Sequence, residues 1–281
     1  MSTPAIRNLC RSPGAIVGAF LLSVVVCAAI MAPWLAPASP TLVHVQDRLL
    51  APLTVQDGMR HWLGTDALGR DVLSRLLVGA RISLFVGLTA VAIGGSLGTA
   101  IGLVSGYHGS WTDRVIMRFG DMQLAFPFIL LALAVMAVLG PGLGNIIGVL
   151  GVTSWVTYAR VVRAEVLSVR EREYVQSARA MGASVGRILL VHALPNVIST
   201  AIVVATFSVA STILSEAGLS FLGLGVGAGT PTWGSMLADA REYVTDAWWL
   251  TTFPGLAILT TVLGVNLVGD WLRDYLDPRL R

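Results

Sequence analysis

The stretch EREYVQSARAMGASVGRILLVHALPN, residues 171–196, is the most charged segment in the second half of a strongly apolar chain, and long apolar runs lie on both sides of it. Glu171 and Glu173 would favour the positive N-terminal end of a helix. Gly182 stands where helices commonly end with a left-handed residue. The stretch is therefore predicted to form two short helices joined at a glycine corner.

The first of these helices is predicted to be amphipathic. Its apolar positions are Tyr174, Val175, Ala178 and Met181, which recur at helical spacing. The second helix is expected to end at the break Leu194-Pro195-Asn196. An apolar face at a membrane surface has three interpretations: it lies on lipid, it packs on its own bundle, or it docks into a groove of a soluble partner.

Composition places the whole chain among membrane proteins. Of its 281 residues, 55% are hydrophobic and 12% are charged, whereas a soluble domain carries about 25% charged residues. The net charge of +3 is small and the basic residues cluster by loop. This pattern indicates membrane orientation and not nucleic-acid binding.

Six apolar segments are long enough to cross a bilayer, whose core needs about 20 helical residues. The segments are residues 15–35, 83–104, 122–139, 143–158, 197–214 and 248–268. The chain is therefore predicted to be an all-α integral membrane protein with six transmembrane helices. Gly94, Gly98 and Gly102 of the second segment recur at every fourth residue. That spacing lets helices approach closely in lipid, although membrane helices are also rich in glycine generally.

The distribution of arginine predicts the orientation of these spans. With both termini in the cytoplasm, thirteen of the 19 basic residues lie inside, among them Arg7, Arg11, Arg279 and Arg281. The chain then divides into a cytoplasmic N-terminus with the first span (1–36), an extracytoplasmic loop (37–82) and a core (83–281). Within the core, residues 159–196 form a cytoplasmic loop between the fourth and fifth spans.

That cytoplasmic loop resembles the EAA loop of ABC importer permeases. The spacing matches at Gln176-Ser177-Ala178, Gly182, His192 and Leu194-Pro195. Three identities depart from the family pattern, because Gln, Ser and His stand at 176, 177 and 192 where Glu, Ala and Ile are usual. The Gln keeps the shape and the hydrogen-bonding ends of Glu without its charge.

Other stretches narrow the resemblance to one subfamily. They are HWLGTDALGRDVLSRLLVGARISL at 61–84, GDMQLAFPFILLAL at 120–133, LSEAGLSFLGLG at 214–225 and PTWGSMLADAR at 231–241. All are similar to the second, C-type permease of the dipeptide, oligopeptide and nickel importers. The resemblance implies the type I importer permease fold, with a coupling helix in the loop between spans four and five.

The resemblance also implies a multi-chain transporter in the bacterial inner membrane. The expected partners are a homologous second permease subunit, two ABC ATPases, an extracytoplasmic substrate-binding protein and membrane lipid, without nucleic acid. The expected cargo is a dipeptide or oligopeptide, with nickel or another small solute as the alternative. The residues expected to couple to the ATPases are Glu173, Tyr174, Gln176, Ser177, Ala178, Met181, Gly182, His192, Leu194 and Pro195.

No catalytic residue, cofactor or metal site is expected in this chain. It has no G-x-x-x-x-G-K-[ST] phosphate loop, so ATP and Mg²⁺ are expected on the separate ATPases. A secondary transporter is the alternative class, but it needs charges or broken helices inside the membrane, and the six segments carry almost no charge. A membrane-embedded enzyme would show a motif such as H-E-x-x-H, which is absent.

Two further groups of polar residues are candidates for function. The first lies in the extracytoplasmic loop and is expected either to dock the binding protein or to hold the loop in a local ion-pair network. The second lies in or near the fifth span and is expected to line or gate the pore; its acidic member could instead be solvated at the outer interface or cap the next segment. The first group is Asp66, Arg70, Asp71 and Arg75, and the second is Ser208, Thr212 and Glu216.

Overall fold

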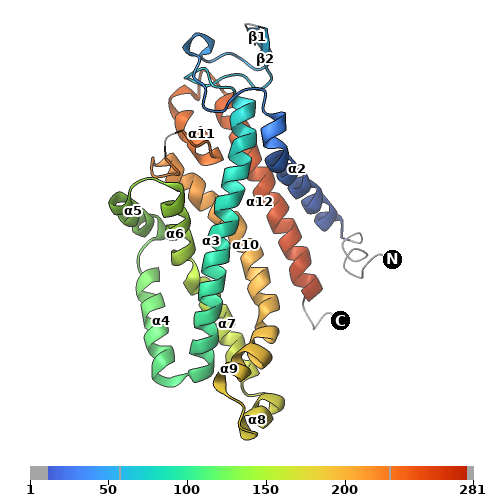
Figure 1. The fold of residues 1–281 in the computed structure, drawn as a ribbon, viewed down its shortest axis with the longest axis vertical. Coiled ribbons are helices and arrows are strands. Elements are labelled where there is room, and N and C mark those ends of the chain that lie inside the picture. Colours follow the sequence, from blue (N-terminus) through green and yellow to red (C-terminus); the bar gives the residue numbers. More distant parts are fainter. Residues whose placement is uncertain (1–11, 57, 228, 277–281) are drawn as a thin grey trace.

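The computed structural model describes residues 12–56, 58–227 and 229–276, most of which are helical (Figure 1). An antiparallel hairpin of β1 (Thr54–Gln56) and β2 (Met59–His61) stands at one end of the molecule, and α8 (Glu173–Ala180) stands at the other. We name these the hairpin end and the α8 end. Short 3-10 turns at Val45–Asp47 and Arg241–Tyr243 lie outside the long helices.

Five helical stretches are each long and apolar enough to cross a membrane, and a bent pair of helices supplies a sixth when it is counted as one span. The described chain therefore has the helical membrane architecture that hydropathy predicts. The five stretches are α2 (Pro13–Leu35), α3 (Val72–His108), α6 (Leu143–Thr153) with α7 (Trp155–Val169), α9 (Val185–Arg187) with the π-helical turn η2 (Ile188–Ala193) and α10 (Leu194–Phe221), and α12 (Trp249–Leu276).

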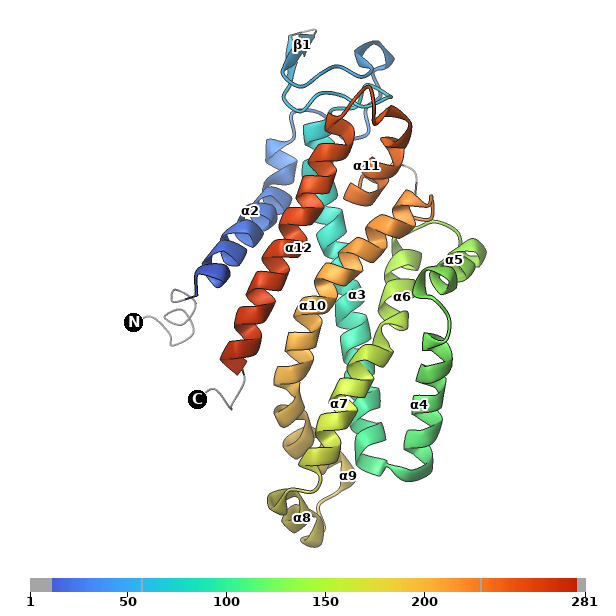
Figure 2. The same cartoon turned by 180° about the vertical axis from the view of Figure 1, so that it is seen from behind.

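The third predicted span, residues 122–139, is not one helix. Instead α4 (Ser110–Leu124) rises from the α8 end, and α5 (Phe128–Leu139) leaves it at 87° (Figure 2). Pro127 accounts for the bend, because a proline drives the preceding residue, here Phe126, out of the helical conformation. Hydropathy could not reveal the bend, since it reports how apolar a segment is and not the direction of its helix axis.

The second predicted span begins earlier than expected, at Val72 and not at residue 83. A carboxylate oxygen of Asp71 accepts a hydrogen bond of 2.8 Å from the backbone N–H of Ser74, which satisfies one of the free donors at the helix start. The segment between α2 and α3 therefore ends at Asp71, and the last part of the predicted extracytoplasmic loop, residues 72–82, is helical.

The predicted break at Leu194-Pro195-Asn196 is also wrong, because the chain passes through these residues as one continuous helix from Val185 to Phe221. The turn before Pro195 is π-helical, and the N–H of Leu194 bonds to the carbonyl of Leu189, five residues back. A proline inside an α-helix crowds the carbonyl four residues earlier. The wider turn relieves this crowding without ending the helix.

The glycine row of α3 packs directly on α6 and α7. Backbone or side-chain atoms of these two helices occupy the places where a Cβ would stand at Gly94, Gly98 and Gly102. At Gly102 the Cβ would lie 2.8 Å from the carbonyl oxygen of Ala159. The predicted close helix approach is therefore confirmed, and Gly106 continues the row.

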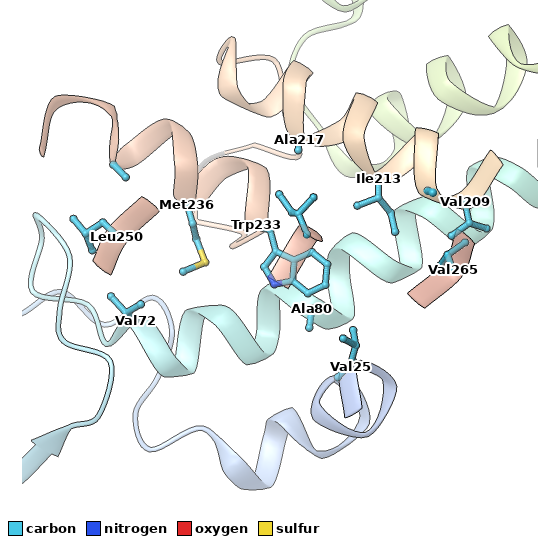
Figure 3. Close-up of a cluster of buried hydrophobic side chains, with 14 of the residues drawn as sticks. Val25, Val72, Ala80, Val209, Ile213, Ala217, Trp233, Met236, Leu250 and Val265 are labelled. Carbon is cyan, nitrogen blue, oxygen red and sulfur yellow. The ribbon is translucent and has the colours of Figure 1, made fainter. Parts of the chain in front are cut away.

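The largest apolar cluster joins the helices near the hairpin end (Figure 3). Trp233, at the start of α11 (Trp233–Asp239), is 1% exposed and shares this cluster with Val25 of α2, Ala80 of α3 and Ile213 of α10. Its indole N–H donates to the carbonyl of Leu76 at 3.2 Å. One aromatic side chain thus fixes α11 against three of the long helices.

Replacing Gly102 with Ala should lower the thermal stability of the detergent-solubilised protein, because the new methyl group forces α3 away from α7. Overpacking of this kind costs about 1–3 kcal/mol. Gly148→Ala in α6 is the matched control, since no atom lies within 4 Å of its Cβ position. The control should be neutral or stabilising, because Ala exceeds Gly in helix propensity by about 1 kcal/mol. Equal melting temperatures for the two variants would contradict the packing account.

Candidate functional site

The glycine corner predicted at the α8 end forms a complete helix-terminating motif. Gly182 has a φ of +81°. Its N–H bonds to the carbonyl of Arg179, and the N–H of Ala183 reaches back to the carbonyl of Ala178, both at 3.0 Å. These two bonds define the Schellman ending of a helix, in which the left-handed residue is usually glycine. The sharp stop after α8 therefore follows from the sequence.

Helix α8 has one face on its own bundle and one face in the open. Val175 and Ala178 are 3% and 7% exposed, and Val175 packs in a cluster with Ile188 and Val197. Tyr174 and Met181, expected on the same face, are instead 43% and 81% exposed. Tyr174 lies about 100° around the helix from Val175. Met181 follows the last helical residue, so helical spacing does not determine which way its side chain points.

Polar contacts fix α8 to the start of α10. Asn196 donates to the Tyr174 hydroxyl at 3.1 Å and accepts from the Arg172 guanidinium at 3.1 Å. The rings of Tyr174 and His192 lie 6.1 Å apart. The side-chain amide of Gln176 donates to the carbonyl of Glu171. Asn196 is a residue that sequence reasoning missed, although it ends the stretch that drew attention to this loop.

The remaining predicted coupling residues surround this contact. Those with exposed positions gather on the outer side of α8 and at the turn into α10, so they remain accessible to another chain. The exposed residues are Glu173, Tyr174, Gln176, Ser177, Met181, Gly182 and Pro195, the half-buried ones are His192 and Leu194, and Ala178 is buried.

An ion pair stabilises the α8 end of the bundle. Both carboxylate oxygens of Asp113 in α4 accept from the Arg163 guanidinium of α7 at 2.5 Å. The hydroxyl of Ser105 in α3 donates to the same carboxylate. Three helices are thereby joined at one point, close to Arg170, which donates to the carbonyl of Gly106. No sequence motif indicated this arrangement.

At the hairpin end, Asp66, Arg70 and Arg75 are turned toward one another. The Asp66 carboxylate accepts from the Arg70 Nε at 2.6 Å and from the Arg75 guanidinium. Both arginines also contact Asp239 of α11 at 2.9 Å. The side chains of Asp66 and Arg75 are each 5% exposed, whereas that of Asp239 is 46% exposed. Of the two expectations for these residues, the contacts match the local ion-pair network.

Asp71 belongs to a neighbouring contact. Besides capping α3, it lies 3.2 Å from the Nδ1 of His61, and its side chain is 1% exposed. The loop that precedes α3 is thus closed by charged groups that face inward. Asp239 was missed by sequence reasoning, because nothing in the sequence links it to residues 66–75.

Glu216 of α10 is buried and not solvated. It is 1% exposed, and one of its carboxylate oxygens accepts from the Ser220 hydroxyl at 2.7 Å. The other carboxylate oxygen has no hydrogen-bond partner. The expectation of a solvated interface position is therefore wrong. Buried polar atoms are rarely left unpaired, so this carboxylate is an unusual feature of the bundle.

The two predicted hydroxyl residues of the pore differ in their surroundings. Thr212 lines a cavity of about 380 Å³ between α10, the α4–α5 bend and the α6–α7 junction. Ser208 lies outside that lining and donates to the carbonyl of Val204 in its own helix. A second cavity, of about 450 Å³, lies at the hairpin end beside Arg70 and Asp239.

Removing the buried carboxylate of Asp66 should lower the stability of the protein more than removing an exposed carboxylate does. Asp66→Ala leaves the buried Arg75 with fewer partners, and breaking a buried pair typically costs about 3–5 kcal/mol. Asp121→Ala is the control, because the Asp121 and Arg160 side chains are 55% and 48% exposed and exposed pairs contribute about 0–1 kcal/mol. Thermal unfolding in detergent should show a clearly larger loss for Asp66→Ala. A larger loss for Asp121→Ala would contradict the burial argument.

Two family models match this chain. Residues 98–281 match the family described as the binding-protein-dependent transport system inner membrane component, and residues 4–52 match the N-terminal TM domain of oligopeptide transport permease C.

Two relatives show the extent of the likeness. The chain is 45% identical over 277 residues to the di/tripeptide transport system permease protein DppC of Pseudomonas aeruginosa, covering 98% of this chain and 91% of that protein. It is 44% identical over 275 residues to the glutathione transport system permease protein GsiD of Escherichia coli, covering 98% of this chain and 89% of that protein. The chain therefore belongs to the family of binding-protein-dependent transport system inner membrane components.

Proposed function

We propose that this chain is one of two permease subunits of an ATP-driven importer of short peptides. The observation that carries the proposal is its likeness, over nearly its whole length, to permeases named for di/tripeptide and glutathione transport. The chain itself supplies half of the pathway and a loop that receives the motion of the ATPases. ATP and Mg²⁺ belong to those ATPases, because this sequence has no phosphate loop.

The proposed assembly contains a homologous second permease, two ABC ATPases and an extracytoplasmic substrate-binding protein in the bacterial inner membrane. The α8 end faces the cytoplasm, because most arginines of the described chain lie on that side of the spans. The ends of α2 and α12 nearest the chain termini point the same way (Figure 1). Arg7, Arg11, Arg279 and Arg281, which also support this orientation, lie outside the described residues.

The coupling residues form a rigid connection between the ATPases and the membrane. The outer side of α8 is free to enter a groove on an ATPase. Its inner side is held to α10 by Val175 and by the contacts of Asn196. A displacement of α8 is therefore passed to α10, and the pathway alternates between two states that ATP binding biases.

Gly182→Val should uncouple the transporter. Its φ of +81° is unfavourable for a β-branched residue, by about 1–2 kcal/mol, so the corner after α8 would shift. Gly140→Val is the matched control, since Gly140 has a φ of +79° and, as at Gly182, no atom lies within 4 Å of its Cβ position. Only Gly182→Val should lose co-purification with the ATPases or the stimulation of ATP hydrolysis by loaded binding protein. Normal coupling in Gly182→Val would refute the docking account.

Reconstitution with the second permease, the ATPases and the binding protein tests the cargo. Peptides of two or three residues, delivered by the binding protein, should stimulate ATP hydrolysis and accumulate inside proteoliposomes, whereas a nickel chelate should do neither. Stimulation by the nickel chelate alone would overturn the peptide assignment and leave the permease role intact.

A further inference from the structure

The cavity at the α4–α5 bend lies where two helices are interrupted. Helix α4 ends at Leu124 and α5 begins at Phe128, while Ser154 separates α6 from α7. Both interruptions contribute to the lining, which faces Thr212 and Ser215 of α10. Non-helical backbone at membrane depth is tolerated where it is buried in protein or lines a water-filled space. Ser154 keeps a helical backbone, with φ of −81° and ψ of −9°, so the non-helical stretch is the bend between Leu124 and Phe128. This bend favours a hydrated cavity here.

Three hydroxyl groups of the lining make no hydrogen bond within the described chain: those of Thr157, Thr212 and Ser215. This is unusual in the present bundle, where hydroxyls in the spans commonly donate to a carbonyl three or four residues earlier. Thr206 and Ser211 of the same helix α10 do so, at 2.9 and 3.0 Å. The three unpaired hydroxyls therefore remain free for water or for a passing solute.

The chemistry of the lining defines what it can contact. None of its residues carries a charge, and apolar side chains such as Phe126 and Leu131 complete it. Phe126 is 63% exposed, so the cavity opens onto the surface of this subunit. Neutral donors and acceptors beside apolar groups suit the main-chain amides and the side chains of a peptide. Because the lining has no charged side chain, it cannot form ion pairs with the termini of a peptide. A peptide would therefore be bound weakly and could pass through.

We infer that this cavity is a contact site for the peptide main chain within this subunit's half of the pathway, with Thr212 and Ser215 supplying the hydrogen bonds. The inference deepens the proposed function and rests on it. The ligand class is a short peptide, recognised through its backbone amides and not through its termini. Ser208 and Glu216, which the sequence grouped with Thr212, are outside the cavity lining.

Cysteine accessibility in the assembled transporter tests whether the cavity is filled with water. The native Cys10 and Cys27 are first replaced by Ala, and a single cysteine is introduced by Thr212→Cys or Ser215→Cys. A membrane-impermeant, water-soluble thiosulfonate should modify both, and a dipeptide delivered by the binding protein under turnover with ATP should slow the modification. Thr206→Cys is the control on the same helix, because Thr206 is outside the lining. Reactivity at 212 and 215 no greater than at 206 would overturn the inference.

Uptake measurements test the hydrogen bonds themselves. Thr212→Val combined with Ser215→Ala should lower uptake of a dipeptide by about threefold to tenfold, the effect of a lost neutral hydrogen bond. A dipeptide methylated on its amide nitrogen should be affected less by the same change, and Thr206→Val should leave the uptake of both unchanged. Equal losses for both peptides, or no loss, would refute the main-chain contact. A failure of the proposed function would look different, because the unmutated transporter would then import neither peptide.

Discussion

The need to pair every backbone polar group governs this structure. Inside a bilayer an unpaired N–H or C=O costs several kcal/mol, so long uninterrupted helices are the default and each departure requires a local solution. Three departures occur among the described residues: the bend at Pro127, the junction at Ser154 and the π-helical turn before Pro195. The first two line one cavity, and the third lies between α8 and α10. The irregular positions of the bundle are therefore also the positions with the clearest functional candidates.

Close packing complements this constraint. Lipid provides little hydrophobic drive for helices to associate, so small residues that allow dense van der Waals contact become important. The glycine row of α3 against α6 and α7 supplies such contact along much of the bundle. Charged groups strengthen the two ends, through Asp113 and Arg163 at the α8 end and through Asp66 and Arg75 at the hairpin end. The bundle thus has a closely packed middle and ion-paired ends, which suits the proposed transfer of motion from α8 to α10.

The sequence predicted what depends on local chemistry. Hydropathy located the spans, glycine spacing indicated the α3 contact, and Gly182 marked the corner after α8. The contacts of Asp239 and Asn196 were not predictable, because each joins residues that are far apart in sequence. Arg75 and Asp239 are 164 residues apart, and Arg172 and Asn196 are 24 residues apart. The bend at Pro127 was missed because hydropathy reports how apolar a segment is and not the direction of its helix axis. The outward position of Tyr174 was missed because a short helix shows too little periodicity to settle which face is buried.

The ion-pair network at the hairpin end has a consequence for biosynthesis. Arg75 and Asp239 are 164 residues apart in sequence yet in direct contact. At a synthesis rate of roughly 5–20 residues per second, Asp239 emerges about 8–30 s after Arg75. During that interval α3 is already available, while Arg70 and Arg75 have only Asp66 to neutralise them. The hairpin end is therefore completed late, after most of the helices have been made.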